Sequence, residues 1–195
     1  MKKKLENIKN GAIDFIKKAK IQFIVLFALL AVDLLTKFLI ANDDRFMSPN
    51  AVIDNFLYLT YVKNPAAAFG FDFGLSKIFG QGGVKIVFIV FSFLFLFIFF
   101  AIFYFWRDRR IFAKVMLVLI LAGGMGNLYD RLFLGYVRDF VSIVFLGFDL
   151  WLFGTEFAIF NIADVCLSVG MIGFVVYMLF MYEKDKKRLA DKNVQ

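Results

Sequence analysis

The sequence contains no histidine, and Cys166 is its only cysteine. One cysteine cannot form a disulfide within the chain, and zinc sites built from histidine and cysteine are excluded as well. The lack of histidine also excludes Ser-His-Asp and Cys-His catalytic units. We therefore expect neither a metal nor another cofactor. Any catalysis must rely on carboxylates, lysine, tyrosine or hydroxyl groups.

Charged residues are few: they make up 20% of the 195 residues, whereas 62% are hydrophobic. The hydrophobic residues collect in four runs of about 20 residues, the length that an α-helix needs to cross a bilayer. These runs span residues 21–41, 84–106, 111–134 and 157–182. The sequence thus predicts an all-α membrane protein with four transmembrane helices.

Positive charge flanks these runs and accounts for the net charge of +7. Of the 23 lysines and arginines, 16 lie in residues 1–20, 107–114 and 183–195. Cytoplasmic segments of membrane proteins carry such an excess of basic residues, so we expect both termini to be cytoplasmic. The same distribution argues against a nucleic-acid partner.

The chain divides into three parts on this basis. Residues 1–20 place apolar residues among lysines, which is typical of a basic amphipathic helix on the cytoplasmic membrane surface. Residues 21–182 form the membrane domain, and residues 183–195 form a basic cytoplasmic tail. A signal peptide is the alternative for the first run. However, no small-residue cleavage site follows it and it carries Asp33 and Lys37, so we interpret it as a retained span.

Two more polar segments, residues 42–83 and 135–156, would lie on the external side. The first holds both prolines and the glycines of residues 80–83. Its stretch 55–63 is rich in aromatic and β-branched residues, which favours short strands. In the second segment Trp151 is a candidate interfacial anchor. We therefore expect a small external β-element next to the four helices.

Several polar residues lie at one depth, in the outer half of the membrane or just beyond it. Spacings of three and four residues place them on single helix faces. The groups are Asp33 with Lys37, Asn127 with Asp130 and Arg131, and Asn161 with Asp164, while Asn64 and Asp139 lie in the external segments. A charged side chain deep in a bilayer costs roughly 2.5–3.5 kcal/mol, so such residues are candidates for function.

Most of these groups also have a structural explanation. Asp33 with Lys37, and Asp130 with Arg131, are also explained as neutral ion pairs. Asn127 and Asn161 are equally explained as donors of interhelical hydrogen bonds, worth about 1–2 kcal/mol each. The sequence leaves both interpretations open for these residues.

Asp139 and Asp164 are harder to explain by structure alone. The basic residue beside Asp139 is Arg138, which points elsewhere if the segment is extended. Two carboxylates in a partly desolvated site split their apparent pKa values. One stays ionised and takes a proton from water, while the other stays protonated and polarises a carbonyl. This is the chemistry of an aspartic protease.

The motifs around these residues resemble those of the bacterial lipoprotein signal peptidases (signal peptidase II). The resemblance covers roughly residues 21–182. The motifs, in family order, are D-x-x-T-K at Asp33–Lys37, N-x-x-x-x-F at Asn64–Phe69, G-G-x-x-G-N-x-x-D-R at Gly123–Arg131, V-x-D-F at Val137–Phe140 and F-N-x-A-D at Phe160–Asp164. The last three together are highly specific.

The resemblance implies an aspartyl endopeptidase of the bacterial inner membrane, with Asp139 and Asp164 as the catalytic dyad facing the external side. It would cut prolipoproteins just before a cysteine that carries diacylglycerol, and globomycin would block it. Membrane lipids would be further partners, and a small β-structure and a short, mobile external helix would cover the site. Residues expected to support the site or the substrate are Asp33, Lys37, Asn64, Phe69, Gly123, Asn127, Asp130, Arg131, Val137 and Asn161.

Two features depart from the family pattern. The family has glycine two residues after the conserved asparagine, whereas this chain has Ala66, preceded by Pro65. Proline fixes φ and alanine disfavours positive φ, so the loop after Asn64 should differ. The loop between Asp139 and Asp164 is also longer, with extra apolar residues in 145–155.

Three other functions fit parts of the sequence. A proton-coupled transporter would spread polar residues through the whole membrane depth and show an internal repeat, and the sequence has neither feature. A non-catalytic scaffold would tolerate asparagine in place of either dyad aspartate. A Ser-Lys protease using Lys37 would need a serine in the outer motifs, which contain none.

Overall fold

The computed structural model describes residues 11, 13–65, 75–106, 108–144 and 159–192. Four helical segments are long and apolar enough to cross a membrane, and they confirm the predicted fold class. They are α2 (Lys20–Ala41), α3 (Leu75–Phe105), α4 (Ile111–Phe133) and a continuous helix made of α5 (Ile162–Val176), the π-helix η3 (Tyr177–Met181) and α6 (Tyr182–Lys192).

The helix α3 bends at Gly80, where φ is +66° and ψ is 172°. This positive φ suits glycine, because other residues meet steric strain there. The membrane-spanning part of α3 is Gly82–Phe105. Residues 75–79 are a separate helical turn ahead of it, within the external segment 42–83.

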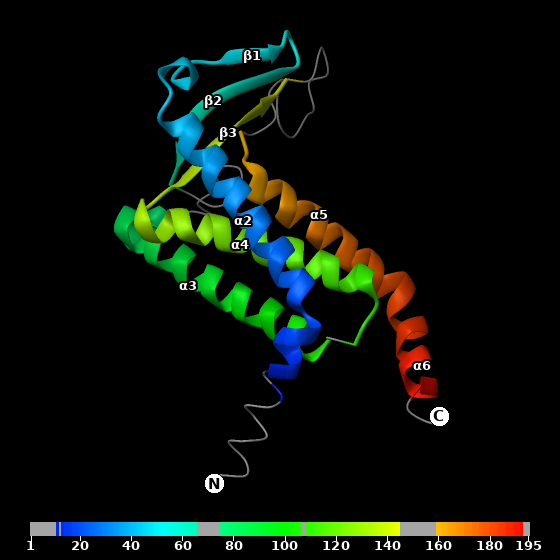
Figure 1. The fold of residues 1–195 in the computed structure, drawn as a ribbon. Coiled ribbons are helices and arrows are strands. Elements are labelled where there is room, and N and C mark those ends of the chain that lie inside the picture. Colours follow the sequence, from blue (N-terminus) through cyan, green and yellow to red (C-terminus); the bar gives the residue numbers. More distant parts are fainter. Residues whose placement is uncertain (1–10, 12, 66–74, 107, 145–158, 193–195) are drawn as a thin grey trace.

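The helix α4 lies at the centre of the bundle, and α2, α3 and α5 all pack against it (Figure 1). In its most apolar 18-residue stretch 61% is buried inside the protein, against 22% in the corresponding stretch of α2 and 17% in those of the other two spans. Side chains of α4 therefore face protein on most sides rather than lipid. This position explains how α4 can carry Asn127 and Asp130 inside a membrane span.

The fourth span begins later than the sequence predicts. Its first helical residue is Ile162, not residue 157, because Asn161 ends the preceding extended segment and caps the helix. The Asn161 side chain accepts from the Asp164 N–H, and the Asp164 carboxylate accepts from the Asn161 N–H. This reciprocal capping box satisfies two backbone donors at the helix start. At the other end the helix continues through α6, so residues 183–192 of the basic tail are helical.

A three-stranded antiparallel sheet, of order β1-β2-β3, caps one end of the bundle (Figure 1). Its strands are β1 (Asn50–Ile53), β2 (Leu57–Asn64) and β3 (Val137–Ile143), and the 3-10 turn η1 (Asp44–Phe46) precedes them. The predicted strand at 55–63 is thus present as β2. The pairing of β3 with β2 joins two segments that lie far apart in the sequence. Val62 is paired with Asp139, and Asn64 is paired with Val137.

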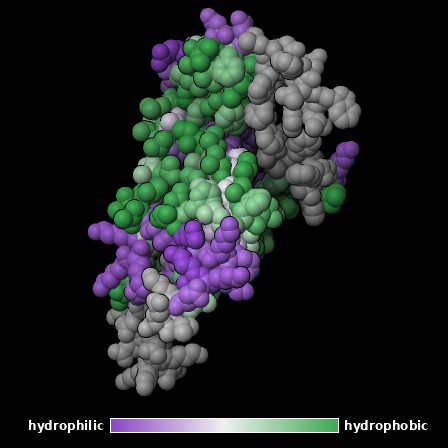
Figure 2. All heavy atoms as spheres, turned by 90° about the vertical axis from the view of Figure 1, so that its right-hand side faces the viewer, coloured by the Kyte–Doolittle hydropathy of each residue, from purple (hydrophilic) through white to green (hydrophobic). Residues whose placement is uncertain are grey.

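The surface has the pattern expected of a membrane protein. On the face that Figure 2 shows, hydrophobic atoms cover the middle of the molecule, and hydrophilic atoms gather above and below them. Large apolar side chains of α3 contribute to the exposed surface: Phe91 is 65% exposed and Phe97 is 73% exposed. Such exposure would be costly in water and is favourable in lipid.

Candidate active site

Asp139 lies on β3 and is only 3% exposed. Asn64 of β2 is paired with Val137 of β3, and Asp139 lies two residues beyond Val137. The side chains of Asn64 and Asp139 therefore point to the same face of the sheet. The Asn64 amide donates to Asp139 Oδ2 at 2.9 Å. The Asn161 amide donates to Asp139 Oδ1 at 2.6 Å. Both oxygens of this carboxylate are therefore held by neutral amide donors.

Asp164 lies in the first turn of α5 and is partly exposed. Its Oδ2 accepts from the Asn161 backbone N–H at 3.1 Å, and its Oδ1 accepts from the Asn127 amide at 2.7 Å. Asn161 therefore binds both carboxylates, through its side chain to Asp139 and through its backbone to Asp164. The loss of this one residue would release both acidic groups.

The orientation of the Asn127 amide follows from Lys37. An ammonium group can only donate, so the Asn127 oxygen must face it, and the distance is 3.0 Å. The Asn127 nitrogen then faces Asp164. The same Asn127 oxygen also accepts from the Asn161 amide at 3.2 Å. Lys37 thus acts on Asp164 through one neutral amide.

A buried ion cluster supports this network from the side of α2. Lys37 is 0% exposed and lies 2.8 Å from Asp33 and 3.7 Å from Asp130. The other oxygen of Asp33 accepts from the backbone N–H of Ala163 at 2.9 Å. This bond joins α2 to the start of α5, one residue before Asp164. The cluster therefore fixes the helix that carries one of the two carboxylates.

Asp130 pairs with Arg138 rather than with Arg131, the partner that the sequence suggests. The Arg138 guanidinium donates to Asp130 Oδ1 at 2.7 Å, and the Arg138 backbone N–H donates to Asp130 Oδ2 at 2.9 Å. The pair ties the end of α4 to β3, immediately beside Asp139. Arg131 instead donates to the Asn127 carbonyl at 3.3 Å, and its guanidinium lies over the Phe88 ring. Residues adjacent on a helix point in different directions, which explains the difference.

Two glycines of α4 permit this close packing. A Cβ at Gly123 would collide with the Ala163 carbonyl, and a Cβ at Gly126 would collide with Asp33 Oδ2. Small residues let helices approach closely in membranes. Without that approach the Asp33 carboxylate could not reach the backbone of α5.

The pKa of Asp139 is raised to about 6. Burial is the largest cause and the charge of Asp164 adds to it, while the Asn64 and Asn161 hydrogen bonds and the charge of Lys37 act in the opposite direction. The amides stabilise the charged carboxylate only in part, since they carry no net charge. A carboxyl group with such a pKa can hold or release a proton near neutral pH. The arrangement can therefore present one protonated and one ionised carboxyl group to a bound substrate.

The structure joins eight of the predicted residues into one network of hydrogen bonds and ion pairs. These residues are Asp33, Lys37, Asn64, Asn127, Asp130, Asp139, Asn161 and Asp164. Val137 is buried beside them as the strand partner of Asn64. Phe69, Ala66 and Trp151 lie outside the described residues. Arg138 was not predicted as a residue of the site. Its position eight residues after Asp130, beyond a turn at Gly135, is a sequence signal that could have indicated their ion pair.

Comparison with known proteins agrees with the sequence resemblance. The family model for signal peptidase (SPase) II matches residues 25–180. A lipoprotein signal peptidase of Syntrophus aciditrophicus is 35% identical over 176 residues, which cover 88% of this chain and 99% of that protein. One from Staphylococcus aureus is 32% identical over 175 residues, covering 89% and 91%.

A solved structure shares the fold. A bacterial membrane enzyme, determined by the in meso method at 2.3 Å resolution, superposes with a TM-score of 0.63 at 27% identity. The alignment covers 82% of this chain and 88% of that one. Peptidase activity is thereby favoured over the transporter and scaffold alternatives. The chain belongs to the signal peptidase II family and is a multi-pass bacterial membrane protease that processes prolipoproteins.

Proposed function

We propose that Asp139 and Asp164 form the catalytic dyad of an aspartyl endopeptidase, which cuts prolipoproteins just before a cysteine that bears diacylglycerol. The observation that carries the proposal is the pair of carboxylates held together by Asn161 at one end of the bundle. A dyad at this depth would meet a peptide bond beside a membrane-embedded substrate segment.

In this proposal Asp139 holds the proton and Asp164 is ionised before reaction. Asp139 is the more buried group, and its pKa, raised to about 6, makes it take up a proton more readily than an ordinary carboxyl group does. Asp164 accepts a proton from water as the water oxygen attacks the scissile carbonyl carbon. Asp139 donates to the carbonyl oxygen and stabilises the developing negative charge. The proton on Asp164 then passes to the departing amine as the C–N bond breaks.

The remaining residues have positioning roles. Asn64, Asn127 and Asn161 hold three carboxylate oxygens with amide donors, and Lys37 fixes the Asn127 amide. Each carboxylate oxygen keeps a second lone pair for water or substrate. Asp33, Asp130 and Arg131 support this arrangement from the surrounding helices, and we assign Gly123, Val137 and Phe69 to packing or substrate contact.

The proposal includes a location. The protein lies in the inner membrane, with both termini in the cytoplasm and the dyad on the external side, as the basic flanks of the four spans favour. The parts 1–20 and 183–195 are the cytoplasmic segments. Membrane lipids surround the spans, and globomycin-type peptides would compete with substrate at the dyad.

The test is cleavage of a diacylated prolipoprotein by the purified protein in detergent. Asp139→Asn and Asp164→Asn should each lower the cleavage rate by a factor of about 10²–10⁴, because each removes a group that transfers or holds a proton. Globomycin should inhibit the wild-type protein. The unfolding temperature should show that both variants remain folded.

A matched control is Asp43→Asn, which changes an aspartate outside the network. Asp43 is bound to Arg45 at the surface beyond α2. Its replacement should leave the cleavage rate unchanged. Full activity in either dyad variant would show that the two aspartates are not the catalytic pair.

A further inference from the structure

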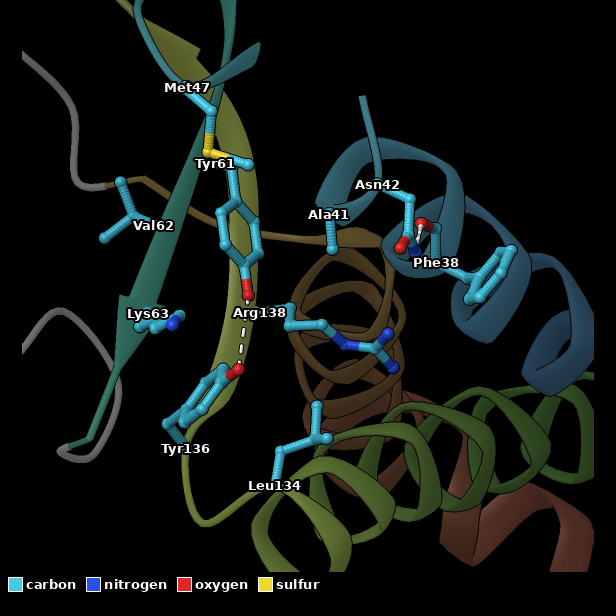
Figure 3. A pocket seen from close by; sticks show the side chains of 10 residues that line it. All are labelled: Phe38, Ala41, Asn42, Met47, Tyr61, Val62, Lys63, Leu134, Tyr136 and Arg138. Atoms are coloured by element: carbon cyan, nitrogen blue, oxygen red, sulfur yellow. Dashed lines mark hydrogen bonds between the residues drawn. The ribbon is translucent and has the colours of Figure 1, made fainter. Parts of the chain in front are cut away.

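A cavity lies between the sheet and the end of α2 (Figure 3). Its volume is about 830 Å³, and it opens beside the ends of α2 and α4. The strand register points Lys63 and Arg138, which line the cavity, away from the Asp139 side chain: they are paired with each other, one residue along each strand from Asp139 and its partner Val62, which also lines the cavity. Successive side chains of a strand point to opposite faces.

Two tyrosine hydroxyls form the polar part of this cavity. Tyr61 of β2 and Tyr136 before β3 point toward one another, with 3.3 Å between their oxygens. One proton serves this bond, so the other hydroxyl proton is left for a further acceptor. Burial and the bond to Tyr136 raise the pKa of Tyr61 to about 12, so it remains a neutral donor near pH 7.

Positive charge gathers around the same tyrosines. The Lys63 ammonium lies 5.3 Å from the centre of the Tyr136 ring. Arg138, the strand partner of Lys63, also lines the cavity. Lys85 lies against the α4–β3 turn at Gly135, where φ is +85° and a Cβ would meet its ammonium group. None of the described residues that line the cavity is acidic. The cavity therefore suits an anion.

Two nearby acidic groups, Asp130 and Asp43, are already engaged. Asp130, behind Arg138, is 0% exposed and is shared between Arg138 and Lys37. Asp43, beyond the end of α2, forms an ion pair with Arg45, with 2.6 Å between Asp43 Oδ2 and the Arg45 guanidinium. The charge of Lys63 is thus the main one available to an anion entering the cavity.

The opposite wall of the cavity is apolar and continues onto the membrane surface. Phe38, three positions before the end of α2, is 57% exposed, and Leu134, just after α4, is 40% exposed. Both line the cavity and both lie where a membrane span ends. The cavity therefore has its cations and hydroxyls at headgroup level and its apolar wall toward the hydrocarbon.

We propose that this cavity binds the headgroup phosphate of an anionic phospholipid from the leaflet next to the sheet. The phosphate lies between Lys63 and the Tyr61–Tyr136 hydroxyls, and the acyl chains follow Phe38 and Leu134. Free phosphate would use the cations and hydroxyls but would leave the apolar wall uncovered. The site is separate from the dyad, so its occupation does not depend on the proposed catalysis.

The test measures lipid binding by the full-length protein. Wild type, Lys63→Gln and Tyr136→Phe are placed in zwitterionic phosphatidylcholine nanodiscs, and binding of a fluorescent phosphatidylglycerol is followed. The loss of the Lys63 charge should weaken binding about fivefold, since a basic residue near an anionic surface contributes about 1 kcal/mol. Tyr136→Phe should weaken it less and should keep the fold, because the ring remains.

Controls distinguish this site from general surface charge and from the dyad. Lys184→Gln removes the same charge at an exposed position of α6 and should leave binding unchanged, and Asp139→Asn should also bind like wild type. Equal affinity of wild type and Lys63→Gln would overturn the proposal, as would an equal loss in Lys184→Gln. Displacement of the lipid by glycerol phosphate at equal concentration would assign the site to a soluble phosphate instead.

Discussion

Two buried aspartates at opposite ends of the molecule have opposite kinds of neighbours. Asp185 of α6 is 0% exposed and accepts from the Tyr177 hydroxyl at 2.7 Å, the Arg110 backbone N–H at 3.0 Å and the Arg188 guanidinium at 2.7 Å. Two arginines thus compensate one carboxylate. The cluster joins the C-terminal helix to the turn before α4.

Asp139 is buried to a similar degree, but no cation of the described part of the chain forms an ion pair with it. Its partners are the amides of Asn64 and Asn161, and its charged neighbour Asp164 has the same sign. A buried carboxylate paired with arginine stays ionised and fastens helices together. One held by neutral amides beside another carboxylate is free to take up a proton. The two sites show how the same side chain serves structure or chemistry.

The largest effect on stability is expected from Lys37→Met, which removes the buried cation that contacts Asp33 and Asp130 beside the dyad. Asp33 would then be buried without its charge partner, which costs about 3–5 kcal/mol in the free energy of unfolding. The Asn127 amide would also lose the group that orients it, so the cleavage rate per folded molecule should fall. Denaturant unfolding in mixed micelles and a cleavage assay measure the two effects.

A control for that change is Lys20→Met, an exposed lysine at the start of the same helix. It should alter neither property. Unchanged stability of Lys37→Met would mean that the buried cluster contributes nothing to holding α2 against α4 and α5.

A second prediction concerns the pH dependence of stability. Because the pKa of Asp139 is raised from 3.8 to about 6 in the folded protein, the folded state binds its proton more tightly than the unfolded state. Stability from this group is therefore present below pH 4 and is lost as pH rises through 6. The stability of Asp139→Asn relative to wild type should increase by about 2 kcal/mol between pH 4 and pH 7.

The measurement is the free energy of unfolding of both proteins across that pH range. The comparison within each pH value cancels the titration of other groups. A difference that stays constant with pH would show that Asp139 has an ordinary pKa in the folded protein.

A smaller effect is expected at the opposite end. Asp185→Asn keeps the size of the side chain but removes the charge that holds two arginines, and we expect a loss of about 1–3 kcal/mol in stability. The cleavage rate per folded molecule should remain that of wild type, because no dyad residue contacts this cluster in the recorded bonds. Loss of activity without loss of stability would remove the distinction between the two aspartates.

The smallest effect is expected for Arg45→Gln, which breaks the exposed Asp43–Arg45 pair. Exposed ion pairs are screened by water and salt and contribute little. The unfolding temperature in detergent should not change measurably. A clear decrease would show that η1 has a structural role that its exposure does not reveal.

Much of the fold could be predicted from the sequence, because membrane insertion depends on local hydrophobicity. The four apolar runs and the basic segments between them are properties of contiguous residues. The start of the fourth span was wrong by five residues, since apolar residues before Asn161 continue the hydrophobic run. The sequence does contain the capping-box pattern, with Asn161 and Asp164 three residues apart, but a helix start predicted from hydropathy alone does not take this pattern into account.

The site was less predictable, because the partner of each polar side chain depends on which segments meet. Asp130 and Arg131 are neighbours in sequence, yet Asp130 pairs with Arg138 after the chain turns at Gly135. The anionic-lipid cavity had no sequence signature at all. Its tyrosines lie 75 residues apart and meet only through the pairing of β2 with β3.

The sequence by itself determined the class of the protein: the spans, the motifs, and the lack of histidine that leaves carboxylates as the available catalytic groups. The tertiary structure alone decided how the carboxylates are held. Only the β2–β3 register brings Asn64 to Asp139, and only the close approach of α4 to α5 brings Asn127 to Asp164. Hydrophobicity acts along the chain, whereas a hydrogen bond needs two groups within about 3 Å, which folding alone provides.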